Sequence, residues 1–265
     1  MISDLFLAFA LACIQGLTEF LPVSSSAHLL FPSLLFGAKD FGLVFDIAVH
    51  AGTLAAVIFY FKEDIFRLFR AWLPWTRDRD EDEFLLGLNL IIATIPIVFV
   101  GLLFSDLISE RMHSVDSIAW ANLIFAGLLL IAFQTASQSK NILGITLGMA
   151  IIIGCLQALA VFPGASRSGM AITGALLVGL NLKDSSKFAF LLSIPTILGA
   201  IVLMLVSEAY VLSMDDLMIL LAGFIGSGVI AFFTIGMFLQ FVERIGMIPF
   251  VVYRILLGLI LLLVW

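Results

Sequence analysis

Charged residues are scarce in this 265-residue chain. Asp, Glu, Lys and Arg make up 12% of it, against about 25% in ordinary soluble domains, while 62% is hydrophobic and the mean hydropathy is +1.20. A soluble globular domain is thereby excluded. Several windows approach ~20 apolar residues, the length that crosses a hydrocarbon core. Because these runs are continuous and do not alternate, helices are favoured over a barrel, and the sequence predicts an all-α polytopic membrane protein.

Cysteines and basic clusters are equally sparse. The two cysteines, Cys13 and Cys155, cannot build a disulfide framework and are interpreted as small core residues. The absence of a basic stripe argues against a nucleic-acid partner. Much of the net charge of −6 comes from residues 77–83, which hold five acids and two arginines and are interpreted as a solvated loop. The apolar N-terminus, with no Lys or Arg ahead of it, predicts a retained segment and not a signal peptide.

What the chain does contain is one motif present twice. Residues 13–20 read Cys-Ile-Gln-Gly-Leu-Thr-Glu-Phe and residues 155–162 read Cys-Leu-Gln-Ala-Leu-Ala-Val-Phe, an offset of 142 residues. Each copy is followed by a proline-containing, hydroxyl-rich stretch, at 22–28 and at 163–169. Duplicated polar breaks in apolar sequence are typical of membrane proteins that build one site from two related halves. We therefore expect a single membrane domain, 1–265, with internal repeats at about 1–136 and 143–265.

The layout of the apolar segments extends this expectation. Both motif regions, about 3–36 and 143–180, are broken midway by Pro with Ser or Gly, which predicts re-entrant helical hairpins. Pro96 and Pro195 lie inside full-length segments and are interpreted as helix kinks. Six transmembrane helices are predicted, at about 42–61, 84–104, 117–136, 188–207, 217–240 and 249–265.

Basic residues give the orientation. If the 62–83 loop is cytoplasmic, the predicted inside loops hold nine Lys and Arg residues and the outside loops hold two, Lys39 and Arg111. Each half is then one hairpin followed by three spans, so the second copy is inverted relative to the first. In this inverted repeat, hairpin 1 enters from outside and hairpin 2 from the cytoplasm, and their tips can meet near the midplane.

The first motif carries ionisable residues at membrane depth. Gln15 and Glu19 are four residues apart and share one helix face. His28 follows a serine run, Ser24, Ser25 and Ser26, for which helix capping is the structural alternative. Charged groups inside a membrane are costly and are candidates for function, which favours a site here.

The second motif is typical of a phosphate cradle. Arg167 is flanked by Ser166 and Ser168 and bracketed by Gly164 and Gly169. The arginine fork matches phosphate oxygens, glycines let backbone N–H groups approach an anion, and a helix start adds its positive dipole end. A purely structural Arg167 side chain, paired with a carboxylate of the first hairpin, is the alternative.

Three further polar residues are less specific. Asp46 and His50 share a face of the first full span, where they either support the site or line a wet cavity. Arg254 begins the last span, and on physical grounds alone it is interpreted as snorkelling to the interface.

Residues 15–28, 163–169 and 248–254 together closely resemble the undecaprenyl-pyrophosphate phosphatase, or bacitracin-resistance protein, family over essentially the whole chain. The resemblance implies an enzyme that removes the terminal phosphate of a polyprenyl pyrophosphate and so recycles the lipid carrier for peptidoglycan synthesis. It implies a multi-pass protein of the bacterial plasma membrane, surrounded by membrane lipids, with a site reached from the outer, periplasmic side. A homodimer is left open.

Carried onto this sequence, the family's functional positions fall on Glu19, Ser25, His28, Ser166 and Arg167. Substrate-binding candidates add the flanking polar and glycine residues of both motifs and the arginine of the third: Gln15, Ser24, Ser26, Gly164, Ser168, Gly169 and Arg254. Gln15 stands where the family often has Glu. This weakens a two-carboxylate site for Mg²⁺ or Ca²⁺ at Glu19, and leaves the metal requirement open; no organic cofactor is expected.

Two mechanisms are compatible with these residues. In the first, Ser25 attacks the terminal phosphorus, His28 or Glu19 takes its proton, and Arg167 with its loop neutralises the phosphoryl oxygens. In the second, water held on a Glu19-bound cation attacks and Ser25 only orients the substrate. The serine route is preferred.

Other functions fit less well. An ion-coupled transporter would suit the inverted repeat, but Arg167 in a Gly/Ser loop suits an anion better than a cation. A lipid-phosphate flippase shares that feature and is separated only by phosphate release. A structural module has no reason to hold Arg, Glu and His near the midplane. The phosphatidic-acid phosphatase superfamily needs a histidine after its Ser-Arg pair, and none follows Ser166-Arg167.

Overall fold

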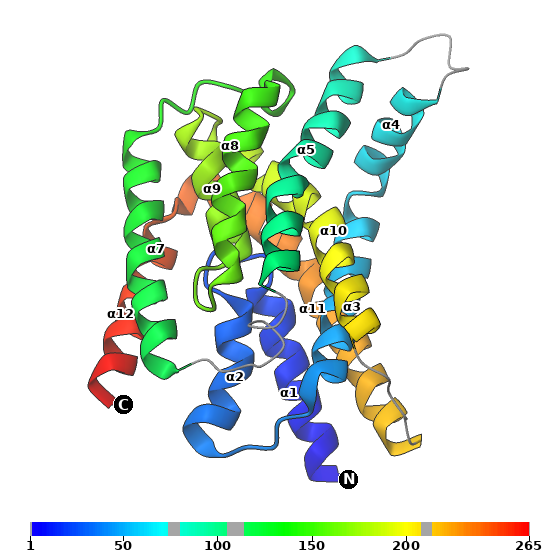
Figure 1. Ribbon diagram of the computed structural model, residues 1–265, viewed down its shortest axis with the longest axis vertical. Coiled ribbons are helices and arrows are strands. Elements are labelled where there is room, and N and C mark those ends of the chain that lie inside the picture. Colours follow the sequence, from blue (N-terminus) through cyan, green and yellow to red (C-terminus); the bar gives the residue numbers. More distant parts are fainter. Residues whose placement is uncertain (1, 74–79, 105–113, 208–213, 265) are drawn as a thin grey trace.

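The protein is described by a computed structural model over residues 2–73, 80–104, 114–207 and 214–264, and these ranges are almost wholly helical (Figure 1). The helices are α1 (Ile2–Thr18), α2 (Ser25–Phe36), α3 (Gly42–Tyr60), α4 (Lys62–Trp72), α5 (Glu81–Leu103), α7 (Val115–Thr135), α8 (Leu147–Ala158), α9 (Arg167–Leu177), α10 (Leu182–Ser207), α11 (Met214–Ile245) and α12 (Ile248–Val264), with 3₁₀ turns η1 (Ile142–Gly144) and η2 (Leu159–Val161).

Five helices, α3, α5, α7, α10 and α11, are long and apolar enough to cross a membrane. They coincide with five of the six predicted spans. The sixth expected span is α12, which is helical and apolar but only 17 residues long in the described chain. Large hydrophobic side chains such as Phe99 and Phe233 lie exposed on the outer surface, as they do where lipid is the solvent. The chain is a multi-pass membrane protein.

The two motif regions fold as broken helical pairs. α1 and α2 are separated by residues 19–24, and α8 and α9 by η2 and the turn that follows it. The α1–α2 pair approaches from one end of the molecule and the α8–α9 pair from the other, and their tips meet near the middle (Figure 1). The Ser168 hydroxyl donates to the Leu21 carbonyl at 2.9 Å across the junction. The expected meeting of the tips is confirmed.

Basic residues collect at one end of the bundle. Lys187 at the start of α10 pairs with Asp64 of α4 at 2.7 Å, and Lys183 lies 4.0 Å from Glu243 near the end of α11. Lys140 contacts the turn between α9 and α10 through the carbonyl of Val178. At the opposite end, Lys39 pairs with the first turn of α1. The loops that were assigned to the cytoplasmic side from charge alone therefore do lie together at one end of the bundle.

Residues 62–83, expected as one loop that includes the solvated acidic run 77–83, are helical in part. Lys62–Trp72 forms α4, whose charged residues alternate with exposed aromatic side chains such as Phe66. The Asp80 carboxylate caps α5 by accepting from the amides of Asp82 and Glu83. Acidic side chains stabilise a helix N-terminus, which explains why part of the acidic run starts a helix. Residues 74–79 of this segment, and the predicted outside loop with Arg111, lie outside the described residues.

The interpretation of both cysteines as core residues was wrong. Cys155 on α8 is exposed and Cys13 on α1 is only partly buried. In a membrane the outer surface is as apolar as the core, so hydrophobic surroundings in the sequence do not distinguish a buried position from a lipid-facing one.

The arrangement of the two ends predicts an asymmetric labelling pattern. In a Cys13→Ala, Cys155→Ala background, Ala38→Cys should react with an impermeant thiol reagent in intact spheroplasts. Ser139→Cys, at the basic end, should react only after the cells are opened, because basic loops face the cytoplasm. Labelling of both positions from one side would contradict the inverted arrangement.

Candidate functional site

Glu19 is the centre of the polar cluster between the hairpin tips. It is only 5% exposed, and its carboxylate is reached from three elements. Gln15, one turn earlier on α1, donates to Oε2 at 2.8 Å, and the Ser25 hydroxyl at the start of α2 donates to the same oxygen at 2.6 Å. His50 of α3 places Nε2 3.7 Å from it. These three side chains converge on one oxygen of the carboxylate, which fixes its orientation.

Arg167 joins the second hairpin to this carboxylate. Its Nη2 donates to Glu19 Oε1 at 2.9 Å, so the structural pairing considered from sequence is present. The other terminal nitrogen, Nη1, is buried without a hydrogen-bond partner in the described structure. A guanidinium with one engaged and one unengaged nitrogen retains capacity to bind an anion.

Both hairpin tips end in a helix start. α2 begins at Ser25 and α9 at Arg167, positions that correspond under the 142-residue offset. The preceding serines, Ser24 and Ser166, both have positive φ, 72° and 70°. This conformation is unfavourable for residues other than glycine and is concentrated at functional sites. Two helix N-termini, whose first-turn amides have no partner within the helix ladder, thus converge on one place, which favours an anion there.

The serines and glycines of the second tip shape the turn. Ser166 caps α9 by accepting from the Gly169 amide at 3.1 Å. Gly164 has φ +93°, and an added Cβ would lie 2.7 Å from the Ile118 carbonyl oxygen. Ser168 is buried and spans the two tips. Substrate binding by these residues stays a prediction.

His28 lies on α2, and its ring is hydrogen-bonded to Ser24 and Tyr253. Its Nδ1 is 2.7 Å from the Ser24 carbonyl, to which it donates, so Nε2 of a neutral ring accepts from the Tyr253 hydroxyl. The two rings also stack, with centroids 5.7 Å apart. Both ring nitrogens are therefore engaged, and Ser25 is hydrogen-bonded to Glu19 instead. Tyr253 was not singled out from sequence, although it adjoins Arg254 in the third motif.

Arg254 does not snorkel. It is completely buried, and its Nη2 donates to the carbonyls of Gly164 and Ala165 at 2.7 and 3.0 Å. Its Nε is 3.3 Å from Asn122 Oδ1 on α7. The backbone carbonyls of an irregular turn at membrane depth need hydrogen-bond donors, and the buried Arg254 side chain is the donor for these two. Arg254 thus holds the turn that carries Arg167.

Two more residues belong to the site region. His50, for which sequence left two interpretations open, lies beside Glu19 and donates from Nδ1 to the Asp46 carbonyl at 2.7 Å. Gln157, the counterpart of Gln15, is fully buried with both amide atoms unpartnered in the described structure. Its place in the duplicated motif was the available signal. Nothing in the sequence marked Asn122.

Glu19 as arranged does not fit a divalent-cation site. Such ions need several oxygen ligands, whereas one Glu19 oxygen is bound to Arg167 and the other to Gln15 and Ser25. Within the described ranges, no three His, Cys, Asp or Glu side chains lie close enough to hold a metal. Binding of Mg²⁺ or Ca²⁺ at Glu19 stays a prediction that requires Arg167 to move away first.

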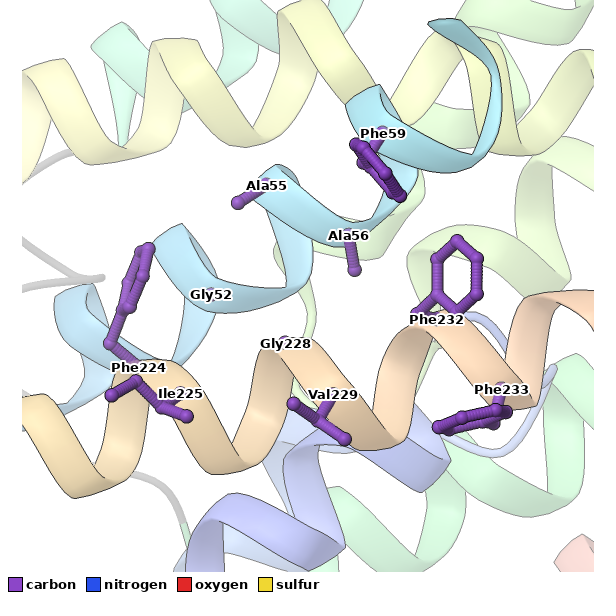
Figure 2. A pocket seen from close by; sticks show the side chains of 10 residues that line it. All are labelled: Gly52, Ala55, Ala56, Phe59, Phe224, Ile225, Gly228, Val229, Phe232 and Phe233. Atoms are coloured by element: carbon purple, nitrogen blue, oxygen red, sulfur yellow. The ribbon is translucent and has the colours of Figure 1, made fainter.

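A hollow of about 350 Å³ lies between α3 and α11, and none of the polar site residues described above lines it. Figure 2 shows its lining, which includes Ala55 and Phe59 on α3 and Phe232 on α11 and is entirely apolar. The hollow contains no group that could bind a phosphate or transfer a proton. The hairpin tips therefore stay the candidate site.

Comparison with known proteins gives a consistent result. A family model described as "Bacitracin resistance protein BacA" matches residues 8–260. A protein of Teredinibacter turnerae named undecaprenyl-diphosphatase is 47% identical over 97% of this chain and 98% of its own length. Relatives with the same name from Saccharophagus degradans and Alcanivorax borkumensis are each 45% identical, over 96% and 98% of both chains.

The burial of Arg254 generates a prediction about stability. Arg254→Met should lower the thermal unfolding temperature in detergent, because the Gly164 and Ala165 carbonyls lose their donor at about 1–3 kcal/mol for each unpaired group. Arg244→Met, at an exposed position on α11, is the matched control and should leave it unchanged. Equal melting temperatures for both variants would contradict the role assigned to Arg254.

Proposed function

The chain belongs to the bacitracin resistance protein BacA family, and from this premise we propose how its site performs the family's reaction. The protein is an integral membrane hydrolase that converts undecaprenyl diphosphate to undecaprenyl phosphate and inorganic phosphate. It thereby recycles the lipid carrier of bacterial cell-wall synthesis and confers bacitracin resistance. One observation carries the assignment of the site. The Ser25 hydroxyl, at the start of α2, is hydrogen-bonded to the Glu19 carboxylate, and Arg167, at the start of α9, pairs with the same carboxylate.

Substrate binding starts with an exchange of partners at Arg167. A diphosphate between the tips offers this guanidinium a doubly charged partner in place of Glu19. Because Arg167 Nη1 has no other partner among the described residues, Nη1 and Nη2 can together form a bidentate contact with the phosphate. The first-turn amides of α2 and α9 add donors. As Arg167 turns to the phosphate, Glu19 loses its counter-charge in a site of low polarity. Its carboxylate is then better able to accept a proton from Ser25.

In the first chemical step, Ser25 Oγ bonds to the terminal phosphorus and the bond from that phosphorus to the bridging oxygen breaks. The hydroxyl proton passes to Glu19, which already accepts from it at 2.6 Å, and undecaprenyl phosphate leaves with the bridging oxygen. Arg167 stabilises the charge that develops on the equatorial oxygens. Of the two bases considered from sequence, the geometry favours Glu19 over His28.

In the second step, water attacks the phosphoserine. Glu19, having passed its first proton to the departing undecaprenyl phosphate, removes a proton from the water; the bond from phosphorus to Ser25 Oγ breaks, inorganic phosphate departs, and Glu19 returns that proton to Ser25 Oγ. His28 supports the reaction by holding the Ser24 carbonyl, and with it the strained turn that aims Ser25. No step is assigned to a metal, since Glu19 is not arranged as a cation ligand.

The membrane arrangement is part of the proposal. The chain is a single domain of two inverted repeats, about 1–136 and 143–265, with six spans and two re-entrant hairpins. The basic end faces the cytoplasm of a bacterial inner membrane, and the substrate reaches the tips from the periplasmic side. Self-association as a homodimer stays a prediction.

Release of phosphate from prenyl diphosphates by the purified protein tests the function. We expect turnover of undecaprenyl diphosphate in detergent, measured with chelator and with added Mg²⁺ or Ca²⁺. Prenyl phosphate and inorganic phosphate should appear in equal amounts. A flat baseline under all three conditions would exclude the enzyme, and lipid movement without phosphate release would indicate a flippase.

Variants of Ser25 and Glu19 separate the two mechanisms. Ser25→Ala should abolish turnover while retaining substrate binding through Arg167, and Glu19→Gln should slow turnover by roughly 10²–10⁴-fold, the contribution of a general base. Acid quenching of the unaltered enzyme during turnover should trap phosphate on the peptide 19–30, detected by mass spectrometry. Ser33→Ala, on the same helix with its hydroxyl bonded to the Leu30 carbonyl, is the control.

The opposite ranking would favour attack by metal-held water. In that case Ser25→Ala would keep robust, metal-dependent hydrolysis, and Glu19→Gln would lose activity and metal dependence together. Robust metal-dependent hydrolysis by Ser25→Ala, without a trapped phosphopeptide, would end the covalent mechanism.

A further inference from the structure

An apolar groove adjoins the proposed reaction site, and the inference drawn from it rests on the proposed function. The groove encloses about 320 Å³ between α5, α10 and the tip of the second hairpin. This volume is within the range of small-molecule sites, ~300–1,000 Å³. Ser26 lines it, next in sequence to Ser25 and 3.4 Å from the Ser24 hydroxyl. Pro163, just ahead of the turn that carries Arg167, lines it too.

The remaining lining is hydrocarbon. From α5 it includes Val98 and Leu102, and from α10 Ala200 and Leu203. Thr196 is the other hydroxyl residue, and its Oγ1 donates to the Leu192 carbonyl of its own helix, so it offers no donor to the groove. The surrounding surface of both helices is exposed and apolar, with Leu102 of α5 59% and Val202 of α10 52% exposed. The groove therefore runs from the polar tips to the lipid-facing surface.

Two glycines help to keep the groove open. Gly101 on α5 and Gly199 on α10 both line it, and neither has a positive φ. A Cβ at Gly101 would meet nothing within 4 Å, and one at Gly199 would only reach the edge of Val98 at 4.0 Å. By contrast, a Cβ at Gly52, where α3 and α11 touch, would lie 2.2 Å from a backbone oxygen. Close packing thus explains Gly52 but neither groove glycine, although glycine weakens a helix by about 1 kcal/mol.

Both walls also contain a proline directly before groove-lining residues. Pro96 precedes Ile97 on α5, and Pro195 precedes Thr196 on α10. Proline inside a helix removes a hydrogen bond and tends to bend the helix, so two helices in contact separate most readily at such points.

We propose that this groove holds the isoprene units next to the diphosphate and guides the rest of the chain into the bilayer between α5 and α10. The occupant is a branched hydrocarbon chain attached to an anion. The apolar walls suit the chain, and continuity with Ser26 and the hairpin tips suits its attachment to the diphosphate. Because lipid is as apolar as the groove, the groove contributes position more than affinity. Without such an exit for the prenyl chain, the attached diphosphate could not bring its terminal phosphorus to Ser25.

The hollow between α3 and α11 provides a matched comparison, since it has similar volume and apolar walls but no polar residue at its edge (Figure 2). Gly199→Leu should fill the groove and lower kcat/KM for undecaprenyl diphosphate by roughly 10²-fold, as a misplacement of about 1 Å can do. Ala55→Leu, which fills the other hollow, should have little effect. Near-normal turnover by a folded Gly199→Leu protein would overturn the proposal.

A second measurement uses the unaltered protein, so that it does not depend on how a variant folds. A farnesyl diphosphate analogue with a benzophenone on the chain should crosslink to residues 97–102 or 196–203, and undecaprenyl phosphate should suppress the crosslink. Crosslinking confined to the α3–α11 hollow would contradict the assignment. Equal suppression by phosphatidylglycerol would also contradict it, by showing that any lipid chain occupies the groove. If the unaltered protein releases no phosphate, the proposed function itself fails, which is a separate result.

Discussion

The ion pair between Arg167 and Glu19 is the interaction on which the rest of the site depends. A charged side chain at membrane depth costs several kcal/mol unless it has a partner, and here each charge is the partner of the other, from opposite hairpins. A buried pair is stabilising only when its remaining polar atoms are also satisfied. Gln15 and Ser25 meet this condition for Glu19. The pair therefore brings together two helical hairpins that enter from opposite ends, and it fixes the carboxylate to which the proposed nucleophile, Ser25, is hydrogen-bonded.

In the proposed mechanism, this ion pair is also what a diphosphate must replace. Arg167 keeps one terminal nitrogen buried and unpartnered, so the resting site is not fully satisfied on the side of the cation. An anionic substrate satisfies the guanidinium and at the same time releases the carboxylate that Ser25 contacts. Binding and activation of the base are then two consequences of one exchange. A site in which Glu19 had no resting partner would instead hold an uncompensated charge whenever substrate was absent.

The helices and loops that depend on local sequence pattern could be predicted from the sequence. The surroundings of single residues, which depend on tertiary contacts, could not. Broken hairpins, five long spans and the segregation of basic loops follow from hydropathy, proline and charge, which act within a segment or at its ends. The burial of Arg254 could not be read in this way, because its partners Gly164 and Asn122 come from distant segments. Exposure of Cys155 was missed because lipid and core are equally apolar. His50 remained undecided because only the fold brings it to Glu19.

The two hairpins share a backbone but divide the chemistry. Ser24 and Ser166 occupy equivalent positions with nearly equal positive φ, so the strained turn that starts a helix at the tip is present in both halves. The residues to which the proposed mechanism gives reactive roles differ between the copies: Ser25 corresponds to Arg167 and Glu19 to Val161. A symmetric pair of turns supplies helix starts that favour an anion from both sides. Under the proposed mechanism, one half alone has either the nucleophile with its base or the cation, so both halves are needed to hold a diphosphate and attack it.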